Sequence, residues 1–293
     1  MQEKHAFSTD TNIDDQWSDL GRWCAEIAPI WSLPPGSEWR VDLSGCGYLG
    51  PFAAAMLFST WLRGKQFGQK PTVVLPTRPE ALVAFCRFSN LEYLIHGGRQ
   101  ADPNHASNET VPLYQFFDHA YEQSLRFLRL IRRHQTLTVD DEFRLTSAIH
   151  EVCQNIEDHA ASPIGGVSCA RYFSGTRTIR VAVVDRGVTI AGSLARRHAL
   201  RDDGHALELV TATKGGTTSG TRVHNRGLGI SNLLGFVRAM RGSLILLSGG
   251  AAAYTSLLQR ELRFERLDWR FPGTAVFFIL SVGRDDVDSD ERD

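Results

Sequence analysis

A polar segment at residues 97–110 (GGRQADPNHASNET) constrains the fold more than any other feature of this 293-residue chain. It contains Pro103, glycines and asparagines but no periodic apolar residues, a composition typical of a linker or a long surface loop. The segment divides the chain into one unit of about 100 residues and another of about 180, each of ordinary domain size. We therefore predict a first domain at residues 1–100, a linker at 101–112 and a second domain at 113–283.

Charge and composition exclude several classes of protein. The 32 Lys and Arg residues nearly balance the 33 Asp and Glu residues, which argues against a protein that binds nucleic acid through its net charge. No apolar run approaches the roughly 18 residues of a membrane span, and the first ten residues lack the apolar core of a secretory signal. We expect a cytoplasmic protein without membrane contact. Residues 284–293 carry six acids and two arginines and predict a disordered acidic tail.

The cysteines indicate a reducing compartment. The five are Cys24, Cys46, Cys86, Cys153 and Cys169. Their number is odd, their spacing is wide, and no two form C-x-x-C, so they build neither a disulfide framework nor a zinc finger. We expect buried free thiols at all of these positions.

Strand and helix patterns alternate in the first domain. Residues 39–43 alternate apolar and polar side chains as a strand does, and residues 72–75 form a short β-branched run. Residues 52–62 are rich in Ala, Leu and Met, and residues 78–88 place Pro79 in a first helical turn, so both predict helices. Short connections join these elements, which predicts a small α/β domain with helices packed on a sheet.

The second domain begins with helices and continues with strands. Apolar residues recur at helical spacing from Phe117 through Tyr121 to Ile131, and a second helix is predicted at residues 140–160. The predicted buried stripe of that second helix is Leu145, Ile149, Val152 and Ile156. Strands are predicted at residues 167–172, 178–184, 243–247 and 274–280.

Four arginines lie between the apolar positions of the first of these helices: Arg126, Arg129, Arg132 and Arg133. They can form either a basic surface for nucleic acid or acidic lipid, or the solvated face of a helix that packs on a core. Solvated faces of this kind are the norm for surface helices, so we expect no nucleic-acid binding.

Several common catalytic motifs are absent from the sequence. There is no G-x-x-x-x-G-K-[ST], which excludes a P-loop NTPase, and no G-x-S-x-G elbow. Gly227 and Gly229 do not continue into G-x-G-x-x-G, so there is no Rossmann fingerprint. His150 and Glu151 begin a zincin motif, but Gln154 stands where the second histidine is required.

A carboxylate and an amide lie one helical turn apart at Glu151 and Asn155. The i,i+4 spacing places both on one face of the second helix, beside its apolar stripe. The amide oxygen can ligate a hard cation such as Mg²⁺, and the carboxylate can orient a water molecule for attack on a phosphate group. By itself, the spacing is more typical of an ordinary exposed polar pair.

Three glycine-containing motifs follow in chain order. Asp185 ends a predicted strand and Gly187 follows it, so the carboxylate can accept a hydrogen bond from an exocyclic amine while the glycine admits a planar ring; a plain Asp-x-Gly turn has the same sequence. Gly227 and Gly229 lead into an apolar helical run, where free N–H groups can bind phosphate. Thr274 follows a glycine at the start of the last strand.

Taken in order and spacing, the four motifs resemble those of the GHKL superfamily of ATP-binding domains over residues 113–282. This superfamily includes gyrase-type, Hsp90-type, MutL-type and histidine-kinase-type proteins, with anti-sigma-factor kinases close to the kinase branch. The helical pair resembles its N box, the Asp-x-Gly motif its G1 box, the two glycines before a helix its G2 box, and the Gly-Thr pair its final motif. The resemblance implies a Bergerat α/β sandwich, in which a mixed sheet with helices on one face binds Mg²⁺-ATP beneath a mobile lid.

The resemblance also implies roles for individual residues. Glu151 is the expected general base, and Asn155 the expected ligand of Mg²⁺. Asp185 is expected to bind the adenine amino group, with Gly187 beside the base and Thr274 supporting it through water.

The lid is expected at residues 204–226, with Gly227 and Gly229 contacting phosphates at its end. Lys214 and Arg226 are candidate phosphate-binding cations, although solvated charges in a lid have the same appearance.

One position departs from the G1 pattern, which is usually Asp-x-Gly-x-Gly. Thr189 stands at the second glycine, and a β-branched residue disfavours positive φ, so we expect the turn to differ locally.

The first domain has a weaker resemblance, to STAS domains. It rests on residues 41–45 (VDLSG), 48–49 (YL) and 88–91 (FSNL), with the helix and strand between them. STAS domains pair with GHKL kinases in bacterial partner switching, where the kinase phosphorylates a Ser or Thr at the start of a helix. Phe52 occupies that position here and has no hydroxyl group, so the resemblance implies a docking or dimerisation module that is not phosphorylated there.

Three functions remain open from the sequence. The first is a Mg²⁺-dependent ATPase whose lid closure changes contacts with a protein partner or a second copy of the chain, and the intact pair Glu151 and Asn155 favours it. The second is a serine/threonine kinase of the anti-sigma-factor type, which would use the same base. The third is a non-catalytic nucleotide-binding module, which the replacement at Thr189 favours.

Overall fold

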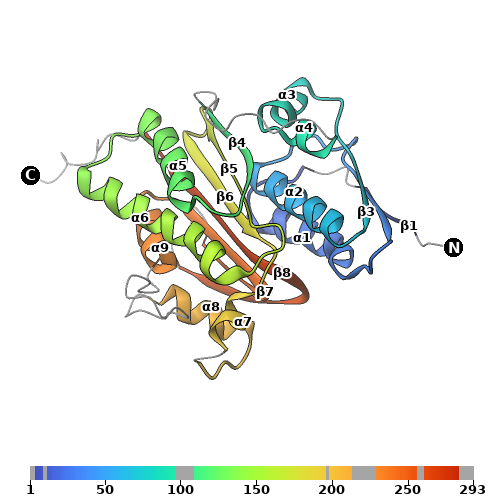
Figure 1. Ribbon diagram of the computed structural model, residues 1–293. Coiled ribbons are helices and arrows are strands. Elements are labelled where there is room, and N and C mark those ends of the chain that lie inside the picture. Colours follow the sequence, from blue (N-terminus) through green and yellow to red (C-terminus); the bar gives the residue numbers. More distant parts are fainter. Residues whose placement is uncertain are drawn as a thin grey trace, which may run out of the picture.

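The computed structural model describes residues 4–8, 12–96, 109–195, 198–212, 229–255 and 261–283. These residues form a mixed α/β structure with two sheets (Figure 1). The first part of the chain contains a parallel sheet of three strands in the order β1-β2-β3. The second part contains a five-stranded sheet in the order β4-β5-β6-β8-β7.

Strands and helices alternate in the first part, as predicted. Its elements are β1 (Lys4–Ser8), α1 (Trp17–Ile27), η1 (Ala28–Ser32), β2 (Glu38–Asp42), α2 (Pro51–Gln66), β3 (Lys70–Val74), α3 (Glu80–Phe88) and α4 (Leu91–Ile95). The two predicted strands correspond to β2 and β3, and the two predicted helices to α2 and α3. Pro79 is the N-cap of α3 and so lies just before its first turn, not within it. The sequence analysis did not identify β1, α1, η1 or α4.

Helix α2 is buried along most of its length. Every residue from 52 to 60 is buried, and a helix that is buried on all sides has no solvent-exposed stripe. The helix lies between the three-stranded sheet and the five-stranded sheet, which cover it from both sides (Figure 1). Gly50 and Pro51 begin the helix, and the buried carboxylate of Asp15 accepts a hydrogen bond from the Phe52 N–H at 3.0 Å.

The second part contains all four predicted strands and both predicted helices. Its elements are β4 (Thr110–Phe116), α5 (Ala120–His134), α6 (Val139–Asn155), the π-helical turn η3 (Ile156–Ala160), β5 (Gly166–Phe173), β6 (Thr178–Asp185), α7 (Ile190–Leu194), α8 (Asp203–Thr211), α9 (Gly229–Ala239), β7 (Ser243–Tyr254) and β8 (Arg263–Ser281).

The five-stranded sheet is antiparallel in each of its described pairings, so the expectation of a mixed sheet was wrong. A short turn joins β5 to β6, and β7 and β8 pair as a second hairpin. This hairpin places β8 between β6 and β7. Strand β8 runs antiparallel to both neighbours, so no parallel pair is present among the described strands of this sheet.

Strand β4 overlaps the predicted linker at residues 101–112. Thr110 and Val111 pair with Arg171 and Ala170 of β5, and Val111 is buried. Pro112 also lies in β4, which is an edge strand of the sheet, where proline is tolerated. The remainder of the linker that the structure describes is Glu109; residues 101–108 lie outside the described residues, as does the predicted acidic tail.

Both faces of the five-stranded sheet are covered, whereas the prediction placed helices on one face only. Helices α5, α6 and α9 cover one face (Figure 1). Helix α2 and η1 cover the other, where Phe52 stacks on Phe277 at 4.8 Å between ring centroids and Trp31 meets Phe271 edge-on at 5.3 Å. One hydrophobic cluster therefore continues from the three-stranded sheet through α2 into the five-stranded sheet.

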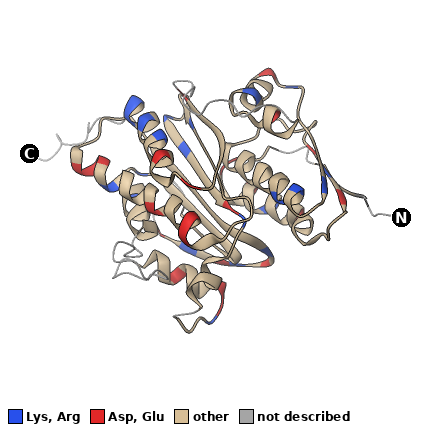
Figure 2. Cartoon of the chain, viewed as in Figure 1, with Lys and Arg blue, Asp and Glu red and all other residues tan. Residues whose placement is uncertain are grey.

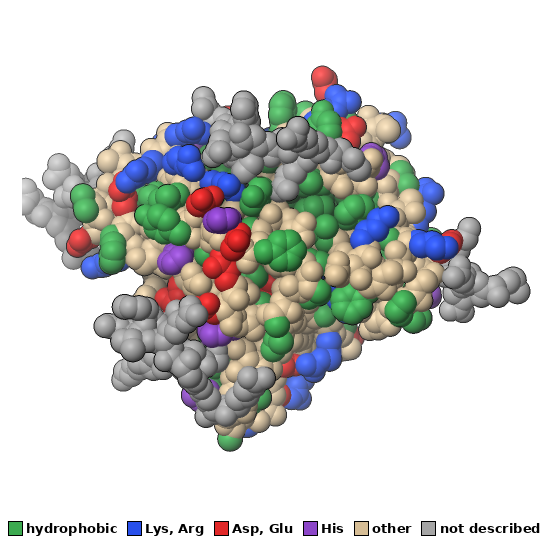
Figure 3. Space-filling model, in the orientation of Figure 1, with side chains coloured by type: hydrophobic (Ala, Val, Ile, Leu, Met, Phe, Trp, Pro, Cys, Tyr) green, Lys and Arg blue, Asp and Glu red, His purple; other side chains and the backbone are tan. Residues whose placement is uncertain are grey.

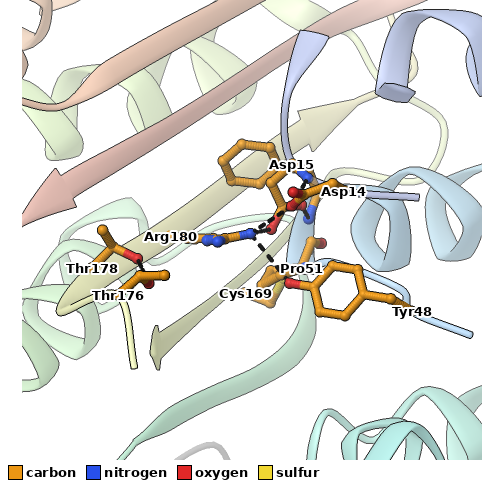
Figure 4. Close-up of polar contacts among 9 residues, drawn as sticks. Asp14, Asp15, Tyr48, Pro51, Cys169, Thr176, Thr178 and Arg180 are labelled. Atoms are coloured by element: carbon orange, nitrogen blue, oxygen red, sulfur yellow. Dashed lines mark hydrogen bonds and ion pairs between the residues drawn. The ribbon is translucent and has the colours of Figure 1, made fainter. Parts of the chain in front are cut away.

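A buried ion pair joins the same two parts of the chain (Figure 4). The Arg180 guanidinium, near the start of β6, lies 2.9 Å from the carboxylates of Asp14 and Asp15, and it donates a hydrogen bond to the Tyr48 hydroxyl at 3.2 Å. Burial raises the pKa of Asp15 to about 6, and the charge of Arg180 opposes this shift. The arrangement joins β6 to the segment that precedes α1 and to the start of α2.

The predicted faces of α5 are partly wrong. Phe117 and Tyr121 are 60% and 57% exposed, and the buried face instead contains Phe127 and Leu130. Arg126 is buried, with its guanidinium 4.4 Å from the centre of the Tyr114 ring.

The other three arginines of α5 are exposed, as expected for a solvated face: Arg129, Arg132 and Arg133. Figure 2 shows basic positions gathered in the C-terminal half of this helix, and Figure 3 shows hydrophobic side chains exposed among charged ones on the same face of the molecule.

The prediction for the cysteines is confirmed, because all five are buried free thiols. Within the described chain, no helix combines the length and the apolar character that a membrane span requires.

We expect Phe52→Ala to lower the free energy of unfolding by about 3–5 kcal/mol, because removal of a fully buried ring leaves a cavity between α2 and β8. Equilibrium unfolding in urea measures the change. Phe88→Ala is the matched control, since Phe88 is 63% exposed and its loss should change the free energy by less than about 0.5 kcal/mol. Equal effects of the two substitutions would contradict the packing described above.

Candidate functional site

A pocket lies between α6, the end of β6, the middle of β8, the short helix α7 and the start of α9. Five residues predicted from the sequence line it: Glu151, Asn155, Asp185, Gly229 and Thr274. They come from four separate elements, and the fold alone brings them together. Apolar side chains form much of the remaining wall: Val183, Val276, Ile156, Ile190, Leu194 and Ile230.

Helix α6 presents the carboxylate and the amide side by side. Thr138 caps the helix by accepting a hydrogen bond from the Asp141 N–H at 3.1 Å, and acidic residues occupy its first turn, as the helix dipole favours. The predicted apolar stripe is buried, whereas Glu151 and Asn155 are half-buried beside it. The helix ends at Asn155, where the backbone widens into the π-helical turn η3, a feature that is frequent at functional sites.

Asp185 ends β6 as a buried carboxyl group. The Gly187 N–H donates a hydrogen bond to its Oδ1 at 2.8 Å, and the Thr274 backbone donates another. Burial raises the pKa of Asp185 to about 7, and these hydrogen bonds together with the charge of Arg186 oppose the shift. The carboxyl group faces the pocket beside the apolar side chains of Val183 and Val276, where it can accept a hydrogen bond from a bound amine.

Two glycines allow backbone segments to approach closely around Asp185. A Cβ on Gly187 would collide with the carbonyl oxygen of Ala160, to which the Val188 N–H donates at 2.6 Å. Gly273 has φ of +120°, and a Cβ there would collide with the carbonyl oxygen of Asp185. Side chains at either position would therefore force the turn after β6 away from η3 or from β8.

Thr189 fits its position for a reason that the sequence analysis did not anticipate. Its φ is −68°, so the backbone does not need the left-handed conformation that a glycine would supply. Its hydroxyl accepts a hydrogen bond from the Gly192 N–H at 3.1 Å and caps α7. The local difference that we expected is thus a capped helix that starts directly after the turn.

The start of α9 lies against the α6 pair. Gly229 is the first residue of α9, and a Cβ there would come within 2.7 Å of the Glu151 side chain. This glycine therefore lets the N-terminus of α9 approach the carboxylate. Lys214, Arg226 and Gly227 lie outside the described residues.

Helix α8 occupies the first part of the predicted lid, and the structure ties its first residue to the long hairpin. Asp203 accepts a hydrogen bond from the Gly250 N–H at 2.8 Å and pairs with Arg270 at 3.0 Å. The rest of the predicted lid, from residue 213, lies outside the described residues.

The sequence analysis missed one residue that lines the pocket and two that adjoin its lining residues. His159 lines the pocket four residues after Asn155, a spacing that could have identified it. Ser248 of β7 accepts a hydrogen bond from the Ile190 N–H at 2.9 Å and lies 3.2 Å from the Thr274 hydroxyl, but it lies in a plain apolar strand with no local signal. Arg186 was seen only as the variable position of the Asp-x-Gly motif.

The residues present fit a divalent cation only in combination with a ligand. The described residues contain no group of three or more His, Cys, Asp or Glu side chains that could hold a metal ion by themselves. A Mg²⁺ ion in this pocket would be held by the Asn155 amide oxygen together with phosphate and water oxygens, which is the donor set that Mg²⁺ prefers.

Comparison of the chain with protein-family models and with curated proteins found no match in either case.

We expect Gly187→Ala to destabilise the fold by about 1–3 kcal/mol, because the added methyl group overpacks the contact with the Ala160 carbonyl group. Thermal or urea unfolding measures the loss. Gly175→Ala is the control, since a Cβ at Gly175 meets no atom within 4 Å. A Gly187→Ala protein as stable as the Gly175→Ala protein would show that the turn after β6 is not closely packed.

Proposed function

We propose that this chain binds Mg²⁺-ATP in the described pocket and hydrolyses it, in the manner that its resemblance to the GHKL superfamily implies. One observation carries the proposal. Glu151, Asn155, Asp185, Gly229 and Thr274 were selected as one site from sequence motifs alone, and all five line a single pocket. The layer of α5, α6 and α9 on one face of the sheet supports a Bergerat-type fold for this part of the chain, whereas the antiparallel pairing and the covered second face depart from the expected pattern.

The chemistry of the pocket suits a purine nucleotide. Val183 and Val276 offer apolar surface to a planar base, and Asp185 accepts a hydrogen bond from its exocyclic amine. In this proposal, backbone N–H groups in the first turn of α9, which begins at Gly229, bind phosphate oxygens.

The two polar residues of α6 complete the proposed site. Asn155 is the residue that would hold Mg²⁺, which neutralises phosphate charge when it is bound. Glu151 orients the attacking water and accepts its proton as general base.

We also propose that the first part of the chain is a STAS-like module that packs against the ATP-binding part of the same chain. Its parallel sheet and alternating helices support this, and the start of α2, where STAS domains carry the phosphorylated hydroxyl, is covered by the five-stranded sheet. Phe52 at this position is fully buried. The kinase alternative therefore requires an acceptor on another protein, reached through this module or through a homodimer.

The decisive test separates nucleotide binding from turnover. We expect the wild-type chain to gain stability with Mg²⁺-ATP, about 2.7 kcal/mol at 100 times the Kd. Glu151→Ala should keep this gain but release phosphate about 10²–10⁴ times more slowly, because it lacks the base. Asp185→Asn should show neither binding nor turnover, because its amide N–H groups would face the amine of the base.

Glu122→Ala and Asp118→Asn are controls on exposed residues of the α5 region, and both should behave as wild type. Use of γ-labelled ATP distinguishes the outcomes: label in free phosphate supports an ATPase, and label on an added protein would establish a kinase instead. Wild-type turnover by Glu151→Ala would refute the assigned base, and no stabilisation of the wild type by millimolar ATP would refute the nucleotide site.

The pKa of Asp185 predicts how ATP affinity depends on pH. A carboxyl group with a pKa of about 7 is mostly neutral at pH 6 and a weaker acceptor, so we expect affinity to fall about tenfold between pH 8 and pH 6. Calorimetric titration at several pH values measures this change. Inosine triphosphate, which has a carbonyl oxygen in place of the amine, controls for protonation of the phosphates, and its affinity should not follow the same titration.

A further inference from the structure

Arg186 directly follows Asp185, but its side chain enters the opposite side of the sheet. Successive side chains alternate between the two faces of a strand. Asp185 therefore faces the pocket, and Arg186 extends towards α2. Its Nε donates to the Ser59 hydroxyl at 3.1 Å, and its Nη2 donates to the Met56 carbonyl oxygen at 3.1 Å and to the Thr60 hydroxyl at 2.5 Å.

This guanidinium is buried without a carboxylate partner. Arg186 is 3% exposed, and no carboxylate of the described chain lies within ion-pair distance of it. Its guanidinium carbon lies 4.3 Å from the centre of the Phe271 ring and 5.1 Å from that of Trp31. Burial and the nearby charge of Arg63 lower the pKa of Arg186 to about 9. A buried charge of this kind is costly unless it is hydrogen-bonded. Here Met56, Ser59 and Thr60 of α2 accept hydrogen bonds from Nε and Nη2, whereas the buried Nη1 has no hydrogen-bond partner among the described residues.

The backbone of Arg186 has little room to adjust if its side chain moves. Its N–H donates to the Ser162 hydroxyl at 3.2 Å. On the other side, a Cβ on Gly273 would lie only 2.8 Å from the Arg186 Cα, which shows how closely β8 approaches. The backbone of Arg186, and with it the turn that holds the Asp185 carboxylate, is therefore packed between Ser162 and β8.

We propose that Arg186 is a positioning residue. Through it, the packing of α2 against the five-stranded sheet determines the affinity of the nucleotide pocket for ATP and its selectivity for the base. This inference rests on the proposed function of Asp185 as the acceptor of the adenine amine. When α2 holds Arg186, Asp185 is held in place to accept that hydrogen bond. When α2 moves away, the guanidinium loses its acceptors and the turn rearranges. By reciprocity, bound ATP strengthens the contact between α2 and the sheet.

A second buried arginine of the same strand provides a matched control. Arg180 also joins β6 to the first part of the chain, through Asp14 and Asp15. It lies six residues from Arg186, about 20 Å along the chain direction of the strand, and does not line the pocket. Loss of the Arg180 ion pair should weaken the contact between the first part of the chain and the five-stranded sheet without changing the turn at Asp185.

The experiment compares Thr60→Val with Asp15→Asn in the full-length chain. Neither residue lines the pocket. Thr60→Val removes a hydroxyl acceptor of Arg186, and Asp15→Asn removes the charge that pairs with Arg180 while keeping one acceptor oxygen. Calorimetry gives the Kd of each protein for Mg²⁺-ATP and Mg²⁺-inosine triphosphate, and urea unfolding gives its stability. We expect Thr60→Val to bind ATP about tenfold more weakly with inosine triphosphate affinity unchanged, the effect of impairing one hydrogen bond to a charged group. Asp15→Asn should keep the wild-type ratio of the two affinities.

Three outcomes separate the possibilities. A wild-type ratio in Thr60→Val, or an equal fall in both variants, would overturn the role of Arg186 while leaving the nucleotide site standing. Absence of ATP binding by the wild-type chain would overturn the proposed function, and this inference with it. The double variant Ser59→Ala, Thr60→Val removes both hydroxyl acceptors of Arg186. It should lower the ratio of ATP affinity to inosine triphosphate affinity further than Thr60→Val alone.

The reciprocal effect is measured by hydrogen exchange of the α2 amides. Saturating ATP should slow this exchange in the wild type and in Asp15→Asn but not in Arg186→Met. Equal slowing in all three proteins would also overturn the coupling.

Discussion

Strand β6 has no solvent-exposed face, and the remaining architecture follows from that constraint. All eight of its residues are buried. Ile179, Val181 and Val183 pack into the cluster beneath α5, α6 and α9, whereas Ala182 and Val184 pack into the cluster that contains α2. A strand with apolar side chains on both faces needs a layer on each side. The second part of the chain supplies one layer, and the first part supplies the other.

The same alternation of side chains separates two charged residues, Asp185 and Arg186, at the end of the strand. Asp185 continues the face that carries Val183, and Arg186 continues the face that carries Val184. Two neighbouring residues of opposite charge thus enter different environments: one borders the proposed nucleotide pocket, and the other lies among hydroxyl groups and aromatic rings of the first part. Each is buried, and neither forms a side-chain ion pair with the other among the described contacts.

Local sequence patterns predicted most of the strands and longer helices and five of the residues that line the pocket, but not the arrangement between distant segments. The apolar runs of β5, β6 and β8 and the spacing of Glu151 and Asn155 are readable from neighbouring residues alone. Residues 110–112 were assigned to the linker because they adjoin the polar segment, and their place in strand β4 became evident only from its pairing with β5. The antiparallel order depends on where the β7–β8 hairpin inserts, which no local pattern records. Arg186 was overlooked because its partners lie more than 120 residues earlier in the chain.

The continuous hydrophobic cluster has a consequence for how this protein can be divided. If residues 113–283 were produced alone, Phe271, Phe277 and the neighbouring apolar side chains of that sheet face would meet water. Exposed patches of this kind promote aggregation or capture of unrelated surfaces. The polar segment thus marks a change in the sequence pattern, but the hydrophobic cluster continues across it. A truncation at this segment would divide the cluster that the two parts of the chain share.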